Sequence, residues 1–361
     1  MHTMIHILNL THEELKAHIK DGMGQPAFRA DQVWQWLWQK GARSFSQMTN
    51  VSKTFRAELE ERFTIVWPEI AAEQKSEDGT VKLLLRLADG ETVETVLIPS
   101  ESREGVGRMT QCLSCQVGCA MACTFCATGQ MGFIRNMTMA EILGQVLVAR
   151  EYLGETEDNP RLRNLVFMGM GEPLLNFTEL MRGLETLNHE MAFNFSPRRI
   201  TVSTCGLPGG LRELGESGLA YLAVSLHAPN QAIRETIMPK AARWSLDELM
   251  GALAAYPLKT RERLTFEYLL LGGVNDAPEH ARALAKLMAR VKAKLNLIVY
   301  NPVPGAPYAA PTPESVQTFS DILHSKRITA IIRKSKGQDI KAACGQLRAE
   351  KHVSGSEAGH E

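Results

Sequence analysis

The sequence predicts an α/β protein built on a mainly parallel β-sheet with covering helices, the sheet being either open or closed as a barrel. Three observations predict this class. The chain has 361 residues, 44% of them hydrophobic, enough for one large core and a smaller accessory domain. Strand-like apolar segments alternate with helical segments over most of the chain. Polar and glycine residues stand at the ends of several of these segments, where a (β/α) barrel builds its site.

The first 75 residues are expected to form a small helical accessory domain. Thr11 can cap a helix, with Glu14 three residues further on. The segment 31–40 places Val33, Trp34, Leu37 and Trp38 on one helical face. A tryptophan stripe at this spacing is more typical of a core than of a base-stacking platform. We therefore interpret the tryptophans at positions 34, 36 and 38 as packing residues.

Residues 76–100 are expected to form a β-hairpin linker region. The segments VKLLLRLA and ETVETVLIP alternate apolar and polar residues, and Asp89 and Gly90 form a turn pair between them. The main domain is expected to span residues 101–347, followed by a frayed tail at 348–361 that is rich in Ser, Gly and Glu. Its predicted strands are RMTQCLSCQ, NLVFMGM, RRITVSTC, YLAVSLH, LTFEYLLL, LNLIVYNP and TAIIRKS.

Composition excludes several classes of protein. No apolar stretch approaches the roughly 18 residues of a membrane span, and the first residues lack the basic and apolar regions of a secretion signal. We therefore expect a soluble cytoplasmic protein without a membrane partner. With 40 Lys and Arg against 40 Asp and Glu, an overall cationic coat for nucleic acid is excluded, but a local basic patch is not.

Five of the seven cysteines lie between positions 112 and 126, a clustering that favours metal binding or catalysis over disulfides. Cys119, Cys123 and Cys126 form a Cys-x3-Cys-x2-Cys pattern on a loop. Three thiolates suit a 4Fe-4S cluster with one iron left open. A structural zinc site stays open as the alternative, since Cys112 and Cys115 form a second Cys-x2-Cys pair. The short gap between the pairs, and the unused Cys119, favour iron and sulfur.

The stretch CLSCQVGCAMACTFCATGQMGF (residues 112–133) resembles the radical S-adenosylmethionine (SAM) RNA adenine methyltransferases, the family that methylates carbon 2 of adenine in ribosomal and transfer RNA. Further segments match in the same order along the chain, from about Glu94 to residue 347. They are FMGMGEPLLN, VSTCG, AVSLHAPN, GVND, YNPVPGAPY and IRKSKGQDIKAACGQL.

The resemblance implies a partial (β/α)6 radical-SAM barrel and a 4Fe-4S cluster on Cys119, Cys123 and Cys126. It also implies the use of two SAM molecules per turnover. An electron would cleave one SAM at the open iron to a 5′-deoxyadenosyl radical. The residues expected to contact SAM are Gly171, Glu172, Ser203, Ser225, Leu226, His227 and Asn301.

The resemblance gives catalytic roles to three more residues. Cys344 would take a methyl group from one SAM, and the radical would remove hydrogen from that S-methyl group before it adds to adenine. Cys112 would release the resulting RNA adduct and form a disulfide with Cys344. Glu94 would accept the proton from carbon 2. On sequence alone a lone cysteine is usually inert, but the basic run 333–337 is expected to lower the pKa of Cys344.

The implied substrates are large-subunit ribosomal RNA and transfer RNA next to the anticodon, with an electron-donor protein such as flavodoxin. Because carbon 2 lies on the pairing edge of adenine, the target must be unpaired or extruded. Two alternatives stay open: a carbon-8 adenine methyltransferase that confers antibiotic resistance, and a redox-sensing RNA-binding protein with a structural metal site. Cys115 and Cys205 match no catalytic position and are interpreted as bystanders.

Overall fold

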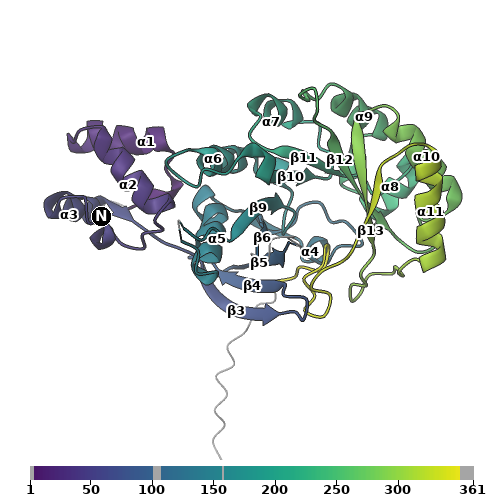
Figure 1. Ribbon diagram of the computed structural model, residues 1–361, viewed down its shortest axis with the longest axis horizontal. Helices are drawn as coiled ribbons and strands as arrows, with labels where there is room; N and C mark the ends of the chain where they lie inside the picture. The colour runs from purple at the N-terminus through teal and green to yellow at the C-terminus, as the bar shows by residue number, and fades with distance from the viewer. Residues whose placement is uncertain (1–3, 101–106, 157, 350–361) are drawn as a thin grey trace, which may run out of the picture.

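The computed structural model describes residues 4–100, 107–156 and 158–349. The N-terminal helices form a separate unit at one end of the molecule (Figure 1). A short parallel pair of strands closes this unit, because Ile5 and His6 pair with Phe63 and Thr64. Its elements are β1 (Ile5–His6), α1 (His12–Ala17), α2 (Phe28–Trp38), α3 (Lys53–Arg62) and β2 (Phe63–Thr64).

The capping residues and the apolar helix face expected from the sequence are both present in this unit. Thr11 and Glu14 form a complete capping box at the start of α1. On α2, Trp34 and Trp38 are fully buried and meet edge to face with ring centroids 5.7 Å apart. The packing interpretation is confirmed for these two. Trp36 is only half-buried, and its indole N–H donates to the Asn50 side chain.

The helical segment ends earlier than residue 75. The last N-terminal helix stops at Arg62, and Glu69–Lys75 forms strand β3 instead. This strand pairs antiparallel with β4 (Val81–Arg86), which pairs in turn with β5 (Thr92–Pro99) around the turn at Asp89 and Gly90. The expected hairpin is confirmed, but its strands continue the main sheet rather than linking two domains.

One ten-stranded sheet organises the rest of the chain, in the order β14-β13-β12-β11-β10-β9-β6-β5-β4-β3. All seven predicted strands are present, and each pairs parallel with its neighbour. Seven parallel strands thus exceed the expected six, and the sheet order leaves β3 and β14 as its two edges. The parallel strands are β6 (Met109–Cys112), β9 (Leu162–Phe167), β10 (Ile200–Thr204), β11 (Tyr221–Ser225), β12 (Leu264–Leu270), β13 (Ala293–Val299) and β14 (Ala330–Arg333).

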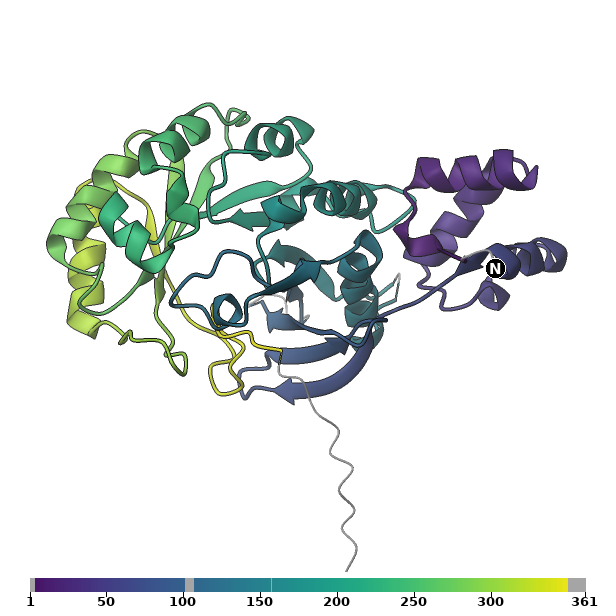
Figure 2. The same ribbon diagram turned by 180° about the vertical axis from the view of Figure 1, so that it is seen from behind.

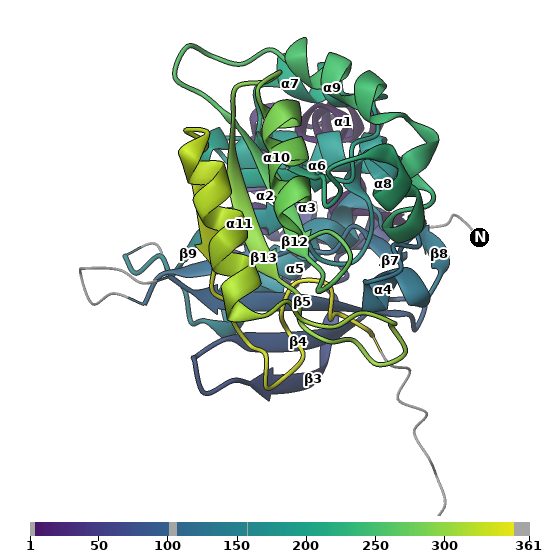
Figure 3. The same cartoon turned by 90° about the vertical axis from the view of Figure 1, so that its right-hand side faces the viewer.

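Helices cover the outer side of the curved sheet, as Figure 3 shows for α10 and α11 outside β12 and β13. A small two-stranded sheet of β7 (Gln116–Gly118) and β8 (Phe133–Asn136) flanks the cysteine loop. No helix in the described ranges is long and apolar enough to cross a membrane. The helices are α4 (Ala127–Gln130), α5 (Met139–Tyr152), α6 (Phe177–Asn188), α7 (Leu211–Ser217), α8 (Gln231–Ile237), α9 (Leu246–Ala254), α10 (Pro278–Met288) and α11 (Pro313–Ser325).

Residues 334–349, called the C-terminal loop below, run from β14 back across the open sheet to β3 and β4 (Figure 2). The turn before β4 holds this loop. The Gly337 N–H donates to the Asp78 carboxylate at 3.0 Å, and the Ser76 hydroxyl donates to Asp339 at 2.6 Å. The loop therefore packs beside the carboxyl ends of the parallel strands. Of the expected tail, residues 350–361 lie outside the described part of the chain.

Candidate active site

A cavity of about 170 Å³ lies at the carboxyl ends of the parallel strands. Residues from eight separate segments converge on it, at the edge of the sheet where a (β/α) fold builds its site. Most of the sequence-predicted site residues line it: Cys119, Cys123, Cys126, Gly171, Glu172, Ser203, Ser225, His227 and Cys344.

The three-cysteine loop is held in a tight fold between β7 and α4. Ala122 takes a left-handed conformation with φ +50°, which is uncommon for a residue with a side chain. A Cβ on Gly129 would lie 2.9 Å from the amide nitrogen of Cys123, so only glycine allows the loop to close this tightly. All three cysteines are partly exposed and face the same cavity.

The thiols of this loop receive backbone hydrogen bonds. The Met121 N–H donates to Cys119 Sγ at 3.5 Å. Backbone N–H groups of Thr128 and Gly129, in the first turn of α4, act on the Cys126 sulfur. Donors of this kind stabilise cluster-bound thiolates. No three His, Cys, Asp or Glu side chains of the described ranges converge to hold one metal ion. The three cysteines instead share one loop and line one cavity.

Gly171 and Glu172 follow β9 and form the next part of the wall. Gly171 has φ +106°, and a Cβ there would lie 2.6 Å from the Gln116 side chain. The buried Glu172 carboxylate accepts from the Leu174 N–H at 3.0 Å and from the Cys205 N–H at 2.8 Å. Burial raises the pKa of Glu172, so the cavity wall presents an oriented carboxyl group.

Ser203 and Ser225 end the neighbouring strands β10 and β11, and their hydroxyls are 3.5 Å apart. His227 follows with φ +52°. Its Nδ1 accepts from the Leu269 N–H at 3.0 Å, and burial followed by the charge of Arg234 lowers its pKa to about 3. His227 is therefore a neutral, fixed imidazole at physiological pH.

Two predicted SAM contacts do not line this cavity. The Leu226 side chain is fully buried, so only its backbone is available to a ligand. Asn301 follows β13 and donates to the Ser335 hydroxyl at 3.0 Å. Gln338 also donates to the Asn301 side-chain oxygen. Asn301 thus contacts the C-terminal loop rather than the cavity.

Cys344 enters the cavity on the C-terminal loop. The loop is tied to the cysteine segment, because the Ala127 N–H donates to the Gly345 carbonyl at 2.8 Å. Cys344 is an exposed residue of the loop and lines the cavity. Loss of solvent there, with the Glu267 carboxylate nearby, raises the pKa of Cys344 to about 11. The expectation that the basic run would lower it is wrong, since the opposing effect of Arg333 is outweighed.

Cys112 ends β6 behind this cavity wall. It is buried, and burial together with the nearby Cys344 thiol raises its pKa. The two sulfurs are therefore close enough to interact electrostatically. All seven cysteines, each within the described ranges, are free thiols in this structure. Of the two expected bystanders, Cys115 is buried apart from the cavity, whereas Cys205 lines it.

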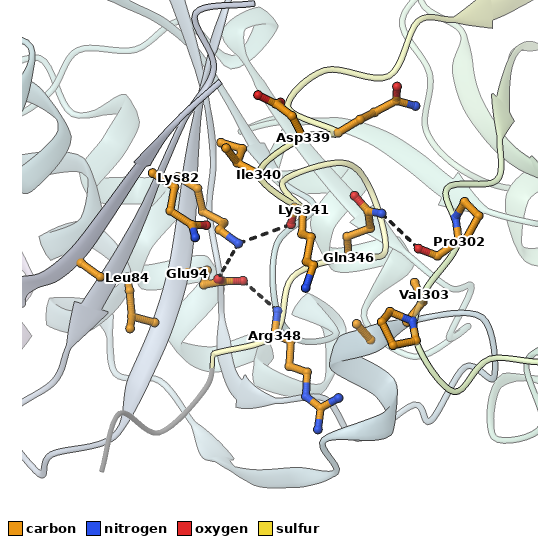
Figure 4. Close-up of a pocket in the computed structure, with 15 residues that line it drawn as sticks. Lys82, Leu84, Glu94, Pro302, Val303, Asp339, Ile340, Lys341, Gln346 and Arg348 are labelled. Atoms are coloured by element: carbon orange, nitrogen blue, oxygen red, sulfur yellow. Dashed lines mark hydrogen bonds and ion pairs between the residues drawn. The ribbon is translucent and has the colours of Figure 1, made fainter. Parts of the chain in front are cut away.

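Glu94 lies on β5 and lines a second cavity of about 560 Å³ on the other side of the C-terminal loop (Figure 4). Its carboxylate is buried. One oxygen is 3.1 Å from the Lys82 ammonium group, and the other accepts from the Arg348 N–H at 2.7 Å. The C-terminal loop separates the two cavities, because Cys344 and Gly345 line the smaller and Gln346 and Arg348 the larger.

Sequence reasoning missed two residues of this region. Lys82 was not singled out, although its place in the hairpin, diagonal to Glu94, could have indicated the ion pair. Glu267, in the middle of β12, is the second. It lines the smaller cavity, accepts from Asn296 at 2.7 Å, and burial raises its pKa to about 7.

A parallel α/β sheet that carries a three-cysteine loop at its carboxyl end defines a radical SAM enzyme. The family model described as the Radical SAM superfamily matches residues 113–285. The model of the ribosomal RNA large subunit methyltransferase N-terminal domain matches residues 5–65, which are the helical unit.

Comparison with known proteins identifies the family within this class of enzymes. A dual-specificity RNA methyltransferase RlmN of Nitratidesulfovibrio vulgaris strain DP4 is 72% identical over 347 residues, covering 96% of this chain and 95% of that protein. One from Oleidesulfovibrio alaskensis is 67% identical, covering 96% of each. The crystal structure of a radical SAM methyltransferase from Sphaerobacter thermophilus matches with a TM-score of 0.88 at 42% identity, covering 96% of this chain and all of that one. The chain belongs to the RlmN family and is a radical SAM RNA methyltransferase.

Proposed function

We propose that this enzyme methylates carbon 2 of adenine in large-subunit ribosomal RNA, and in transfer RNA next to the anticodon. Cys344 carries the methyl group and Cys112 resolves the RNA adduct. The observation that carries the proposal is the shared cavity: Cys344 faces the same space as Cys119, Cys123 and Cys126. Dual-specificity RNA methyltransferases at up to 72% identity support the two RNA substrates.

Cys119, Cys123 and Cys126 would hold a 4Fe-4S cluster. The cluster, with SAM and an electron from a donor protein such as flavodoxin, would supply the radical chemistry, and a second SAM would supply the methyl group. Gly171 and the Glu172 carboxyl group, which line the cavity, would receive the SAM amino group. Ser203, Ser225 and His227 form the facing wall. The buried Leu226 would offer only its backbone, and Asn301 holds the C-terminal loop through Ser335.

Cys344 keeps the methyl carbon at the boundary between the two cavities. Carbon 2 of adenine is electron-poor, so it does not attack a sulfonium methyl group as a nucleophile. A carbon radical on the Cys344 sulfur adds to it instead. Glu94 lies on the larger side of the C-terminal loop, where its carboxylate accepts the proton that leaves carbon 2.

Cys112 completes the reaction as the second thiol. Its thiolate attacks the Cys344 sulfur, a sulfur–sulfur bond forms, and the carbon–sulfur bond to the RNA breaks. The unpaired electron that radical addition leaves on the adenine adduct would return to the cluster. The released carbon keeps the bonding electron pair, takes a proton and becomes the methyl group. The electrostatic contact between the two thiols supports this pairing. An external reductant must then restore both thiols.

The direct test is anaerobic reconstitution with iron, sulfide, SAM, reductant and transcripts of both RNA classes. We expect 5′-deoxyadenosine together with 2-methyladenosine in both transcripts. Mass mapping of the methylated nucleoside separates the alternatives, because 8-methyladenosine would show the carbon-8 activity. Iron-bound protein that neither cleaves SAM nor methylates either RNA would instead support the structural-metal alternative.

A further inference from the structure

Lys82 and Glu94 form a nearly buried ion pair beside the larger cavity. On the β4–β5 hairpin Lys82 pairs with Val96 and Leu84 pairs with Glu94, so the two charged residues are diagonal neighbours on one face. The Lys82 Nζ lies 3.1 Å from Glu94 Oε1, and the two side chains are 11% and 5% exposed. Burying two charges is costly unless both are well paired, which indicates that this pair has a role other than stability.

The same pair holds the C-terminal loop on both sides of Cys344. The Lys82 Nζ also donates to the Lys341 carbonyl at 3.5 Å, three residues before Cys344. The Arg348 N–H donates to Glu94 Oε2 at 2.7 Å, four residues after it. Figure 4 shows both contacts converging on the ion pair. Lys341 has φ +52°, a conformation that persists only where surrounding contacts fix it.

We propose that Lys82 is a positioning residue for the proton transfer: it holds the Glu94 carboxylate in place and fixes the loop that presents Cys344 to it. This inference rests on the proposed function, which assigns Glu94 as the proton acceptor. In that step the C2–H bond breaks, the proton passes to a Glu94 oxygen, and the electron pair stays with the RNA adduct. Lys82 does not touch the reacting atoms: it acts through the Glu94 carboxylate and through the Lys341 carbonyl of the loop.

The step at which the reaction stops distinguishes this role from a general structural one. If Lys82 serves the proton step, its loss stalls the reaction after the RNA has become attached to Cys344. The SAM cleavage that precedes this stall takes place in the smaller cavity and should proceed as in the parent. A covalent protein–RNA species therefore accumulates, while 5′-deoxyadenosine still forms. A structural defect would lower SAM cleavage and adduct formation together.

The experiment uses the reconstituted full-length enzyme with ribosomal RNA transcript. Lys82→Met is compared with Lys82→Arg, which keeps the charge, and with Arg86→Met. Arg86 is exposed on the same strand and, being four positions on, the same face, so it is the matched control. We expect Lys82→Met to lower 2-methyladenosine formation by at least about tenfold, as loss of acid–base assistance does. It should keep first-turnover 5′-deoxyadenosine formation within about twofold of the parent and accumulate the protein–RNA species. Lys82→Arg should recover most of the rate.

A double variant sharpens the result. Because the proton step depends on Glu94, Lys82→Met should cause only a small further loss, from its contact with the Lys341 carbonyl, once Glu94→Gln is present. Additive losses in the double variant would overturn the inference. So would a Lys82→Met rate equal to that of Arg86→Met, or a parallel fall in 5′-deoxyadenosine. A parent enzyme that makes no 2-methyladenosine would overturn the proposed function and this inference with it.

Discussion

The Ala127 N–H donates to the Gly345 carbonyl at 2.8 Å, which joins the residue after Cys126 to the residue after Cys344. A second contact reinforces it, because the Thr128 hydroxyl donates to the Leu347 carbonyl at 2.6 Å. These bonds place the end of the three-cysteine loop against the C-terminal loop. These contacts hold Cys344 in the wall of the smaller cavity, where SAM would bind.

Replacement of Cys112 should trap the reaction. In Cys112→Ala the RNA adduct on Cys344 has no thiol to release it, so a covalent protein–RNA species should accumulate on denaturing gels while free methylated RNA falls below detection. Cys115→Ala is the matched control, since Cys115 is also buried and lies three residues further on. It should turn over normally. Trapping in Cys115→Ala, or continued release in Cys112→Ala, would contradict the assignment.

Gly171 should tolerate no side chain. An alanine Cβ would lie 2.6 Å from the Gln116 side chain and 2.8 Å from its amide nitrogen, at φ +106°. We expect Gly171→Ala to lower the free energy of unfolding by at least about 2 kcal/mol and to abolish SAM binding. Gly209 has open space around it and no positive φ, so Gly209→Ala should stay within about 0.5 kcal/mol of the parent. Urea unfolding and equilibrium SAM binding measure both, and equal effects of the two variants would refute the prediction.

Glu267 should make stability fall as pH rises toward neutrality. Burial raises its pKa from 4.5 to about 7, so between these values the folded state binds the extra proton, and ionisation above them opposes folding. Such a shift corresponds to about 3 kcal/mol. Glu267→Gln removes this titration, so the stability of the variant relative to the parent should rise between pH 4.5 and 7 and then level off. Urea unfolding across this range tests it; a difference independent of pH would count against the buried carboxylate.

Much of the fold could be predicted from local pattern. Alternating apolar residues and a turn pair determine the β4–β5 hairpin, and the Thr11 capping box determines the start of α1. Strand β3 could not be predicted in this way. Its sequence EIAAEQK consists mostly of helix-favouring residues, and it is mainly exposed at the sheet edge. Pairing with β4, a contact that local pattern does not encode, makes it a strand.

The candidate site, like the fold, could be predicted from the sequence only in part. Strand ends could be predicted to gather Glu172, Ser203 and Ser225, because parallel strands share one edge. The contact of Lys82 with the C-terminal loop, and the separation of Glu94 from the smaller cavity, depend on where that loop returns across the sheet. The direction of the Cys344 pKa shift could not be predicted for a related reason. Charges near in sequence matter less than the desolvating walls and the Glu267 carboxylate, which fold next to it.

The central claim is that Cys344 carries the methyl group. The most direct measurement is peptide mass spectrometry of the reconstituted enzyme after incubation with SAM bearing a trideuterated methyl group, without RNA. The account predicts a labelled methyl group on the Cys344 sulfur, lost on addition of RNA with a reductant, and none on Cys112, Cys115 or Cys205. An unlabelled Cys344 in an enzyme that goes on to methylate RNA would contradict it.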